Sequence, residues 1–239
     1  MIVEIMKGNY SGRELILMIL IMLFALTISF SVHEFMHAFA ATLFGDDTPG
    51  YMGRLTLNPA AHLDPIGTLC LLFVGFGWGK PVLYNPNKLT RFKSKRFMRI
   101  MVSLAGIIGN FIVGLIASII IVFIARFAGE SFIFSNAGAA LISTLFYTRL
   151  FSVGLMGFNL LPIPPLDGFR VIEEILPLKI KYSDGWKKFV YYGNRVLFVI
   201  VILGSMTGIH LLNGLMNAIE FPFNLAIDSI CALIARLIA

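Results

Sequence analysis

Residues 15–37 read LILMILIMLFALTISFSVHEFMH, and this stretch decides the fold class. Residues 15–30 carry no charge, and the run is expected to continue as one helix to about Phe44. At a rise of about 1.5 Å per residue, about 30 residues give about 45 Å, which is enough to cross a hydrocarbon core of about 30 Å. The apolar run leads without a break into three ionisable residues, His33, Glu34 and His37.

The composition of the 239 residues supports a membrane protein. The chain is 58% hydrophobic and 13% charged, with a mean hydropathy of +0.86, whereas soluble domains are about 45–50% apolar and about 25% charged. This balance excludes an ordinary soluble domain, a disordered chain and a nucleic-acid-binding module, and it predicts a single membrane-embedded domain over residues 1–239. Cys70 and Cys231 lie in apolar stretches and are too few for a disulfide framework or a thiolate metal cluster.

Four further apolar segments follow the first helix, so we expect an all-α polytopic membrane protein with about five transmembrane helices. These segments are residues 100–125, 141–161, 196–212 and 221–237. Residues 66–84 start with an apolar stretch, 66–76, that is too short to span as a helix and is broken by glycines, so a re-entrant hairpin with an edge strand is predicted over 66–84. Arg149 lies inside a span and is expected to extend toward the membrane surface. The core of the domain is expected over residues 14–175, with accessory C-terminal helices over residues 190–239.

Basic residues predict the orientation. Residues 88–99 and 179–195 are rich in Lys and Arg and are expected in the cytoplasm, whereas residues 128–137 and 211–222 lack both and are expected on the opposite side. If residues 66–84 re-enter without crossing, the two histidines and Asp167 approach the same, cytoplasmic end. If they cross, the histidines and Asp167 lie on opposite sides; the glycines favour re-entry.

The sequence His33-Glu34-Phe35-Met36-His37 is an H-E-x-x-H motif. On a helix, positions i and i+4 share a face, so both imidazoles can hold one Zn²⁺ while the Glu acts as general base toward a water. A charged residue near the bilayer centre costs about 2.5–3.5 kcal/mol, so such residues need a partner or a purpose. A metal site is therefore favoured over a His–Glu pair that only stabilises the bundle.

Catalytic zinc takes three protein ligands and a water. Asp167 is the best candidate for the third ligand, within the segment NLLPIPPLDG at residues 159–168. Prolines end one helix and can start another, so this turn can place the carboxylate at membrane depth. The spacing alone leaves open a second interpretation, in which Asp167 merely caps the following helix.

The sequence resembles the site-2 protease family of intramembrane zinc metalloproteases, in its compact prokaryotic branch without a PDZ or nucleotide-binding domain. The resemblance covers roughly residues 15–175, and the last part of the chain adds nothing to it. It rests on four blocks in order: HEFMH at 33–37, GD at 45–46 with GRLTLNP at 53–59 and HLDPIGT at 62–68, GWGKPV at 77–82, and NLLPIPPLDG at 159–168.

The resemblance implies one Zn²⁺ per chain, bound by His33, His37 and Asp167, with Glu34 as the general base. It also implies that Asn159 positions the substrate carbonyl or stabilises the oxyanion. A prokaryotic plasma membrane, an active site toward the cytoplasm and a transmembrane protein substrate follow from the same resemblance. There are two departures from the family pattern: Phe169 replaces a second Gly after the Asp, and Ile107 stands where Pro is common.

Four other residues have less defined roles. His62 and Asp64 precede the predicted hairpin, and Gly77 and Lys80 lie within it. They are candidates for supporting a ligand or contacting substrate, but a His–Asp pair that only orders its loop is an equal alternative. The glycine-rich stretch either presents an extended edge to an unwound substrate or forms a tight turn.

The sequence therefore predicts a zinc-dependent intramembrane endopeptidase that acts on a transmembrane protein within the lipid bilayer, with no nucleic-acid partner. Two alternatives use the same histidines: a divalent-metal transporter with His33, His37 and Asp167 as a transit site, and a membrane gluzincin with Glu173 or Glu174 as third ligand. The absence of a repeat disfavours the transporter. The physiological substrate and the oligomeric state stay open.

Overall fold

The structure, a computed structural model, describes residues 11–74, 77–207 and 212–238. The predicted all-α class is confirmed, because these residues form helices and contain only one isolated antiparallel bridge, between Leu63 and Gly79. Four helices of the described chain are long and apolar enough to span a membrane: α2 (Gly12–Leu43), α6 (Lys95–Phe127), α8 (Asn136–Asn159) and α12 (Asn213–Leu237). The predicted span 196–212 falls on the second half of α11 (Asp184–Thr207) and on residues 208–211, which lie outside the described residues. The shorter helices are α3 (Thr48–Tyr51), α4 (Pro59–His62), α5 (Pro65–Val74), α7 (Glu130–Ile133), α9 (Asp167–Ile175) and α10 (Leu178–Lys181).

Serine residues start three of the long helices. The Ser11 hydroxyl accepts the N–H of Glu14 at 3.3 Å, and the Glu14 carboxylate accepts the N–H of Ser11 at 2.8 Å, which forms a capping box. Ser94 and Ser135 accept backbone N–H groups in the same way at the starts of α6 and α8. Each cap satisfies an N–H group that the first turn of a helix leaves without a partner.

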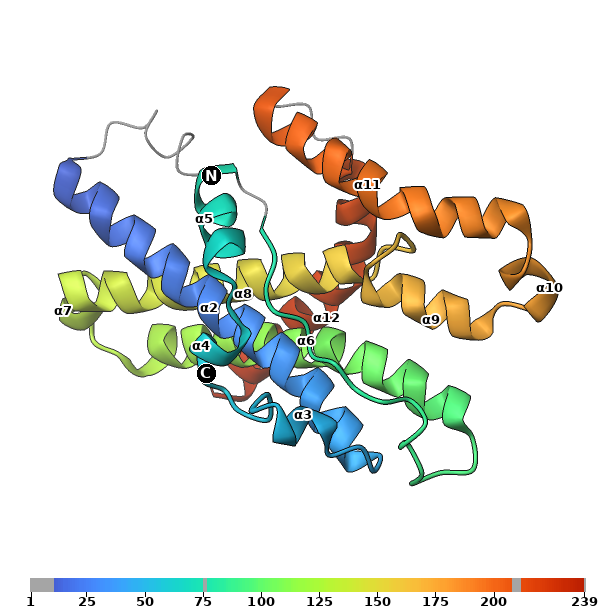
Figure 1. Cartoon of the computed structure of the whole chain (residues 1–239). Coiled ribbons are helices and arrows are strands. Elements are labelled where there is room, and N and C mark those ends of the chain that lie inside the picture. Colours follow the sequence, from blue (N-terminus) through green and yellow to red (C-terminus); the bar gives the residue numbers. More distant parts are fainter. Residues whose placement is uncertain (1–10, 75–76, 208–211, 239) are drawn as a thin grey trace.

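Helices α2, α6 and α8 contact one another and form the centre of the molecule, with α2 lying across the other two in Figure 1. Between α2 and α8, the hydroxyls of Ser29 and Ser152 lie 2.8 Å apart, and both side chains are fully buried. Small residues at such a contact let the helix backbones approach closely, and a hydrogen bond between them satisfies both hydroxyls away from water. This packing fixes the helix that carries the H-E-x-x-H motif.

Helix α12 runs antiparallel to α8. Its Glu220 packs against Gly157, and its Asp228 forms an ion pair with Arg149 at 2.7 Å. The guanidinium of Arg149 has an acidic partner on the neighbouring helix, and its extension toward the membrane surface stays a prediction. Pairing two charges within a membrane bundle costs less free energy than leaving one unpaired.

The path of the chain after α11 also differs from the prediction. The described start of the 211–222 connection packs at the end of the bundle where α8 finishes, since Leu212, Met216 and Ile219 pack against the buried cluster of Leu161, Leu166 and Leu197. The far end of α12 lies beside the end of α6, where Arg126 Nε donates to the carbonyl of Ile238 at 2.8 Å. Residues 212–219 therefore lie at the same end as the basic start of α6, because the absence of Lys and Arg from a short connection does not by itself fix the side on which it lies.

Only part of the predicted hairpin at residues 66–84 can be described. Helix α5 forms its first arm, residues 75–76 lie outside the described residues, and residues 77–84 run in extended form beside α2. The Lys80 N–H donates to the carbonyl of His62 at 2.7 Å, which joins the extended segment to the loop before α5. Gly79 allows this approach, because a Cβ there would lie 2.8 Å from the carbonyl oxygen of His62 and 2.1 Å from the ring of Phe30 on α2.

Asp46 ties the end of α2 to the segment that leads into α6. Its side chain is fully buried, and its carboxylate accepts the N–H and hydroxyl of Thr48 and the N–H of Asn85. Three donors satisfy the buried negative charge. Asp46 belongs to one of the sequence blocks that carry the family resemblance, and the structure shows that it closes this loop.

Asp46→Ala removes the acceptor and leaves the N–H of Asn85 without this partner, so we expect a loss of about 1.5–3 kcal/mol of stability. The midpoint of thermal unfolding in detergent should fall by several degrees. The neighbouring exposed Asp47 makes no capping bond, so Asp47→Ala serves as the control and should leave the midpoint unchanged. Equal midpoints for the two variants would contradict this role.

Candidate metal centre

Two imidazoles on α2 start the site. His33 and His37 are one helical turn apart and both are buried. Their Nε2 atoms lie 3.1 Å from each other, and their rings meet edge to face. The spacing i, i+4 places both on one face of the helix, as the motif predicts.

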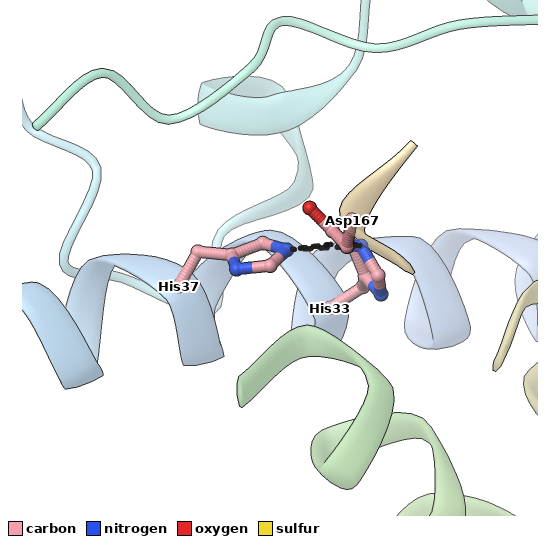
Figure 2. A group of neighbouring side chains, drawn as sticks. All are labelled: His33, His37 and Asp167. Atoms are coloured by element: carbon pink, nitrogen blue, oxygen red, sulfur yellow. Dashed lines mark hydrogen bonds and ion pairs between the residues drawn. The ribbon is translucent and has the colours of Figure 1, made fainter. Parts of the chain in front are cut away.

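The turn after α8 brings Asp167 to these rings. Asp167 is the first residue of α9, and its Oδ2 atom lies 3.2 Å from His33 Nε2 and 3.0 Å from His37 Nε2. Figure 2 shows the three side chains converging from the two segments. The carboxylate points at the imidazoles, and α9 has no side-chain cap, so the structure does not support the interpretation of Asp167 as a mere helix cap.

The convergence of these atoms fits a metal ion. The three ligand atoms lie within 4.8 Å of one another, and among the described residues the buried Asp167 Oδ2 has no well-formed hydrogen-bond partner. The Nδ1 atom of His37 lies 2.7 Å from the carbonyl oxygen of Val102, so Nδ1 carries the proton and Nε2 presents a lone pair to the centre. Two imidazoles and one carboxylate are a donor set for catalytic Zn²⁺.

Helix α6 also orients the imidazole of His33. The fully buried side-chain amide of Asn110 lies against His33, with Nδ2 3.2 Å from Nδ1, while its Oδ1 has no partner among the described residues. The amide turned by half a rotation presents Oδ1 to Nδ1–H and leaves Nε2 of His33 free to bind a metal. The sequence motifs do not indicate this role for Asn110, although an Asn inside an uncharged span is a signal of a buried polar contact.

Glu34 is held beside the metal ligands by the extended segment. Its Oε2 accepts the N–H of Val82 at 3.1 Å, and its side chain is buried. The bond fixes the carboxylate at the wall of a cavity of about 570 Å³, which His33, His37 and Asp167 also line. A carboxylate so placed can take up a proton from a water molecule in the cavity.

The remaining walls of the cavity come from five segments. Residues 77–84, the first half of α6, the end of α8, the start of α9 and the middle of α11 each contribute residues. Asn159 lines the cavity at the end of α8, and one of its Nδ2 hydrogens is given to the carbonyl of Leu155 at 2.9 Å. Burial raises the pKa of the Tyr84 hydroxyl, so this wall residue stays neutral.

The four less defined residues lie in different places. His62 is fully buried and its Nε2 contacts the carbonyl of Thr56 at 2.8 Å, while Asp64 Oδ1 accepts the N–H of Gly67 at 2.9 Å. Both bonds order the loop around α4 and α5. Gly77 lines the cavity, whereas Lys80 bonds to the loop through its backbone. Of the four, the structure brings only Gly77 to the cavity.

The acidic residues of the gluzincin alternative are placed away from the metal ligands. Glu174 forms a two-point ion pair with Arg99, at 2.7 and 2.8 Å. Among the described residues, the group of potential ligands contains Asp167 and neither Glu173 nor Glu174. The structure therefore favours Asp167 as the third ligand.

Comparisons with known proteins place the chain among metalloproteases. The sequence profile of Peptidase family M50 matches residues 128–204, which include Asn159 and Asp167. The chain is 40% identical over 152 residues to "Putative zinc metalloprotease YwhC" of Bacillus subtilis, a match that covers 64% of this chain and 67% of that protein. It is 30% identical over 185 residues to "Putative zinc metalloprotease Rip2" of Mycobacterium tuberculosis, covering 74% of this chain and 66% of the relative.

The chain therefore belongs to peptidase family M50, the site-2 protease family. The predictions of a metalloprotease, of a zinc cofactor and of membrane helices are confirmed at this level. No solved structure matches the chain.

Gly106 of α6 lets the two imidazoles sit against the helix backbone. A Cβ at this position would lie 2.5 Å from His37 Nε2 and 2.6 Å from His33 Cε1. Gly106→Ala should therefore displace the ligands and lower the zinc content of the purified protein well below one ion per chain, as measured by atomic emission. Gly154 on α8 has open space around it, so Gly154→Ala should keep its zinc; equal zinc contents would contradict the steric argument.

Asn110→Ala removes the group that orients His33, and loss of such a partner typically weakens metal affinity about 10- to 100-fold. Competition with a zinc chelator of known affinity measures this change. Ser118→Ala is the matched control, since the buried Ser118 hydroxyl lies on the same helix but bonds to the carbonyl of Gly114. An unchanged zinc affinity in Asn110→Ala would show that Asn110 does not position the ligand.

Proposed function

We propose that this chain is a zinc-dependent intramembrane endopeptidase that hydrolyses a peptide bond in or near a transmembrane helix of its substrate. One observation carries the proposal: the three potential metal ligands and the tethered Glu34 line one cavity, and the histidines and Glu34 lie on a helix long and apolar enough to cross a membrane. Membership of family M50 supports the zinc-dependent protease activity.

In this proposal His33, His37 and Asp167 hold the zinc ion. When bound there, zinc supplies a Lewis acid that activates water and polarises a carbonyl group. Glu34 takes up the proton that the water loses and delivers it to the nitrogen of the leaving amine. The bond from Val82 keeps the Glu34 carboxylate in position for both transfers.

Asn159 has a donor left for the substrate. A side-chain amide carries two N–H donors, and one of those on Asn159 is used by Leu155. The second can donate to the carbonyl oxygen of the bond under attack, where negative charge develops. This geometry supports the role that the family resemblance implies.

Residues 77–84 are the proposed binding edge. One side of the segment is joined to the loop at His62 and Leu63, and its glycines and Val82 line the cavity. A substrate helix has to unwind before cleavage, and its freed backbone groups can pair with an extended edge by strand addition. The site faces the cytoplasm in this proposal, because it lies near the end of the bundle where the basic residues before α6 gather.

The decisive experiment compares cleavage with metal content. Purified full-length protein is incubated with zinc and a mixture of synthetic apolar peptides long enough to span a micelle, and products are identified by mass spectrometry. Glu34→Gln should lower the rate of cleavage by at least about 10²-fold while keeping its zinc, and Asp167→Ala should lose both. Glu173→Gln, on the same helix as Asp167 but outside the cavity, should retain both.

Cleavage that survives in Glu34→Gln would contradict the role of this residue as base. Zinc flux into vesicles by the wild-type protein and by Glu34→Gln, with no cleavage of any peptide, would instead identify a transporter.

A further inference from the structure

One guanidinium group at the cavity stands without an acidic partner. Arg170 of α9 is exposed and lines the cavity, three residues after Asp167. No hydrogen bond or ion pair joins its side chain to any of the described residues, although Glu173 and Glu174 follow within about one helical turn.

The neighbouring arginines differ from Arg170, because both have partners for their guanidinium groups. Arg99 uses its guanidinium on Glu174, and Arg96 donates to the carbonyl of Ile175 at 2.8 Å. Both are thereby committed to holding α6 against α9. Arg170 takes no part in that contact and its positive charge is left facing the cavity.

We propose that Arg170 is a specificity-determining residue that binds an acidic side chain of the substrate polypeptide close to the cleaved bond. The proposal rests on the endopeptidase function and adds a substrate class to it. A guanidinium presents paired N–H donors that match the two oxygens of a carboxylate.

The walls of the cavity strengthen such a contact. Trp78, Leu155 and Phe158 line it with apolar surface, and a charge pair interacts more strongly where water is partly excluded. Burial raises the pKa of the nearby Tyr84 hydroxyl, so this group stays neutral and does not serve as a counter-ion to Arg170. The positive charge of Arg170 is thus available to a negatively charged ligand.

The geometry also sets the distance between the cleaved peptide bond and the acidic residue of the substrate. Three residues of helix separate Asp167 from Arg170, a rise of about 4.5 Å. A substrate in extended form advances about 3.3 Å per residue. With two long side chains meeting, the carboxylate belongs about one to four residues from the bond that is cleaved, at one fixed position or two neighbouring ones.

A binding measurement tests this without relying on catalysis. Zinc-loaded, full-length Glu34→Gln protein in non-ionic detergent is titrated with fluorescent synthetic peptides, each with one apolar segment in which a single Glu is moved along the sequence, or with Gln at the same place. At the preferred position the Glu peptide should bind about tenfold more tightly than the Gln peptide, because a hydrogen bond to a charged group contributes about 1.5–3 kcal/mol. Added salt should reduce the difference.

Variants of Arg170 are then made in the same Glu34→Gln background. Arg170→Gln should abolish the preference for Glu, Arg170→Lys should keep part of it, and Arg170→Glu should reverse it in favour of peptides with Lys. Arg91→Gln is the matched control, since Arg91 is also exposed but lies outside the cavity, and it should leave the preference intact. A merely structural role of Arg170 would not produce a reversal.

The outcomes separate this inference from the proposed function. If wild-type protein cleaves the Gln peptides in a zinc-dependent way but Glu gives no tighter binding at any position, the inference is overturned and the endopeptidase stands. If Glu peptides bind through Arg170 while no peptide is cleaved, the endopeptidase is overturned and the acidic subsite stands. If the only effect of Arg170→Gln is that peptide binding in nanodiscs no longer depends on anionic lipid, Arg170 contacts lipid phosphate and the inference is overturned.

Discussion

The structure depends on the meeting of two imidazoles from α2 with a carboxylate from the start of α9, inside a bundle of apolar helices. Three atoms that carry lone pairs or negative charge would repel one another if nothing lay between them. A cation shared by all three, as proposed, would turn this repulsion into attraction. Such an ion would tie together two segments that are distant in the sequence, so metal binding would contribute to the stability of the fold as well as to its chemistry.

Helix α6 supplies the setting for these ligands. Gly106 leaves room for the rings, the carbonyl of Val102 fixes the tautomer of His37, and Asn110 lies against His33. Within about two turns, one face of α6 thus provides room for both imidazoles, a hydrogen-bond acceptor for His37 and a side-chain amide for His33. Because these groups fix the directions of the imidazoles before a metal arrives, less conformational freedom has to be lost on binding.

The sequence predicts this site only in part, for a physical reason. The spacing of His33 and His37 is a local property of a helix and is sufficient to place both rings on one face. The position of Asp167 depends on how the turn after α8 packs, so spacing alone does not distinguish a metal ligand from a helix cap. The contributions of Asn110 and Gly106 depend on contacts between distant helices; an Asn inside an uncharged span signals a buried polar contact, but no local pattern identifies its partner. The same limit applies to Arg149, whose partner Asp228 lies on another helix, and to the side of the bundle on which α12 begins.

The hydrogen bond from the Val82 N–H to Glu34 has a mechanical consequence. The backbone that lies along the cavity wall also holds the group proposed to move protons, so the two cannot shift independently. A substrate polypeptide that rigidifies residues 77–84 would also fix the Glu34 carboxylate, and a displacement of these residues would move the carboxylate away from the metal ligands. Binding of a polypeptide along residues 77–84 would therefore also act on the position of the proposed base.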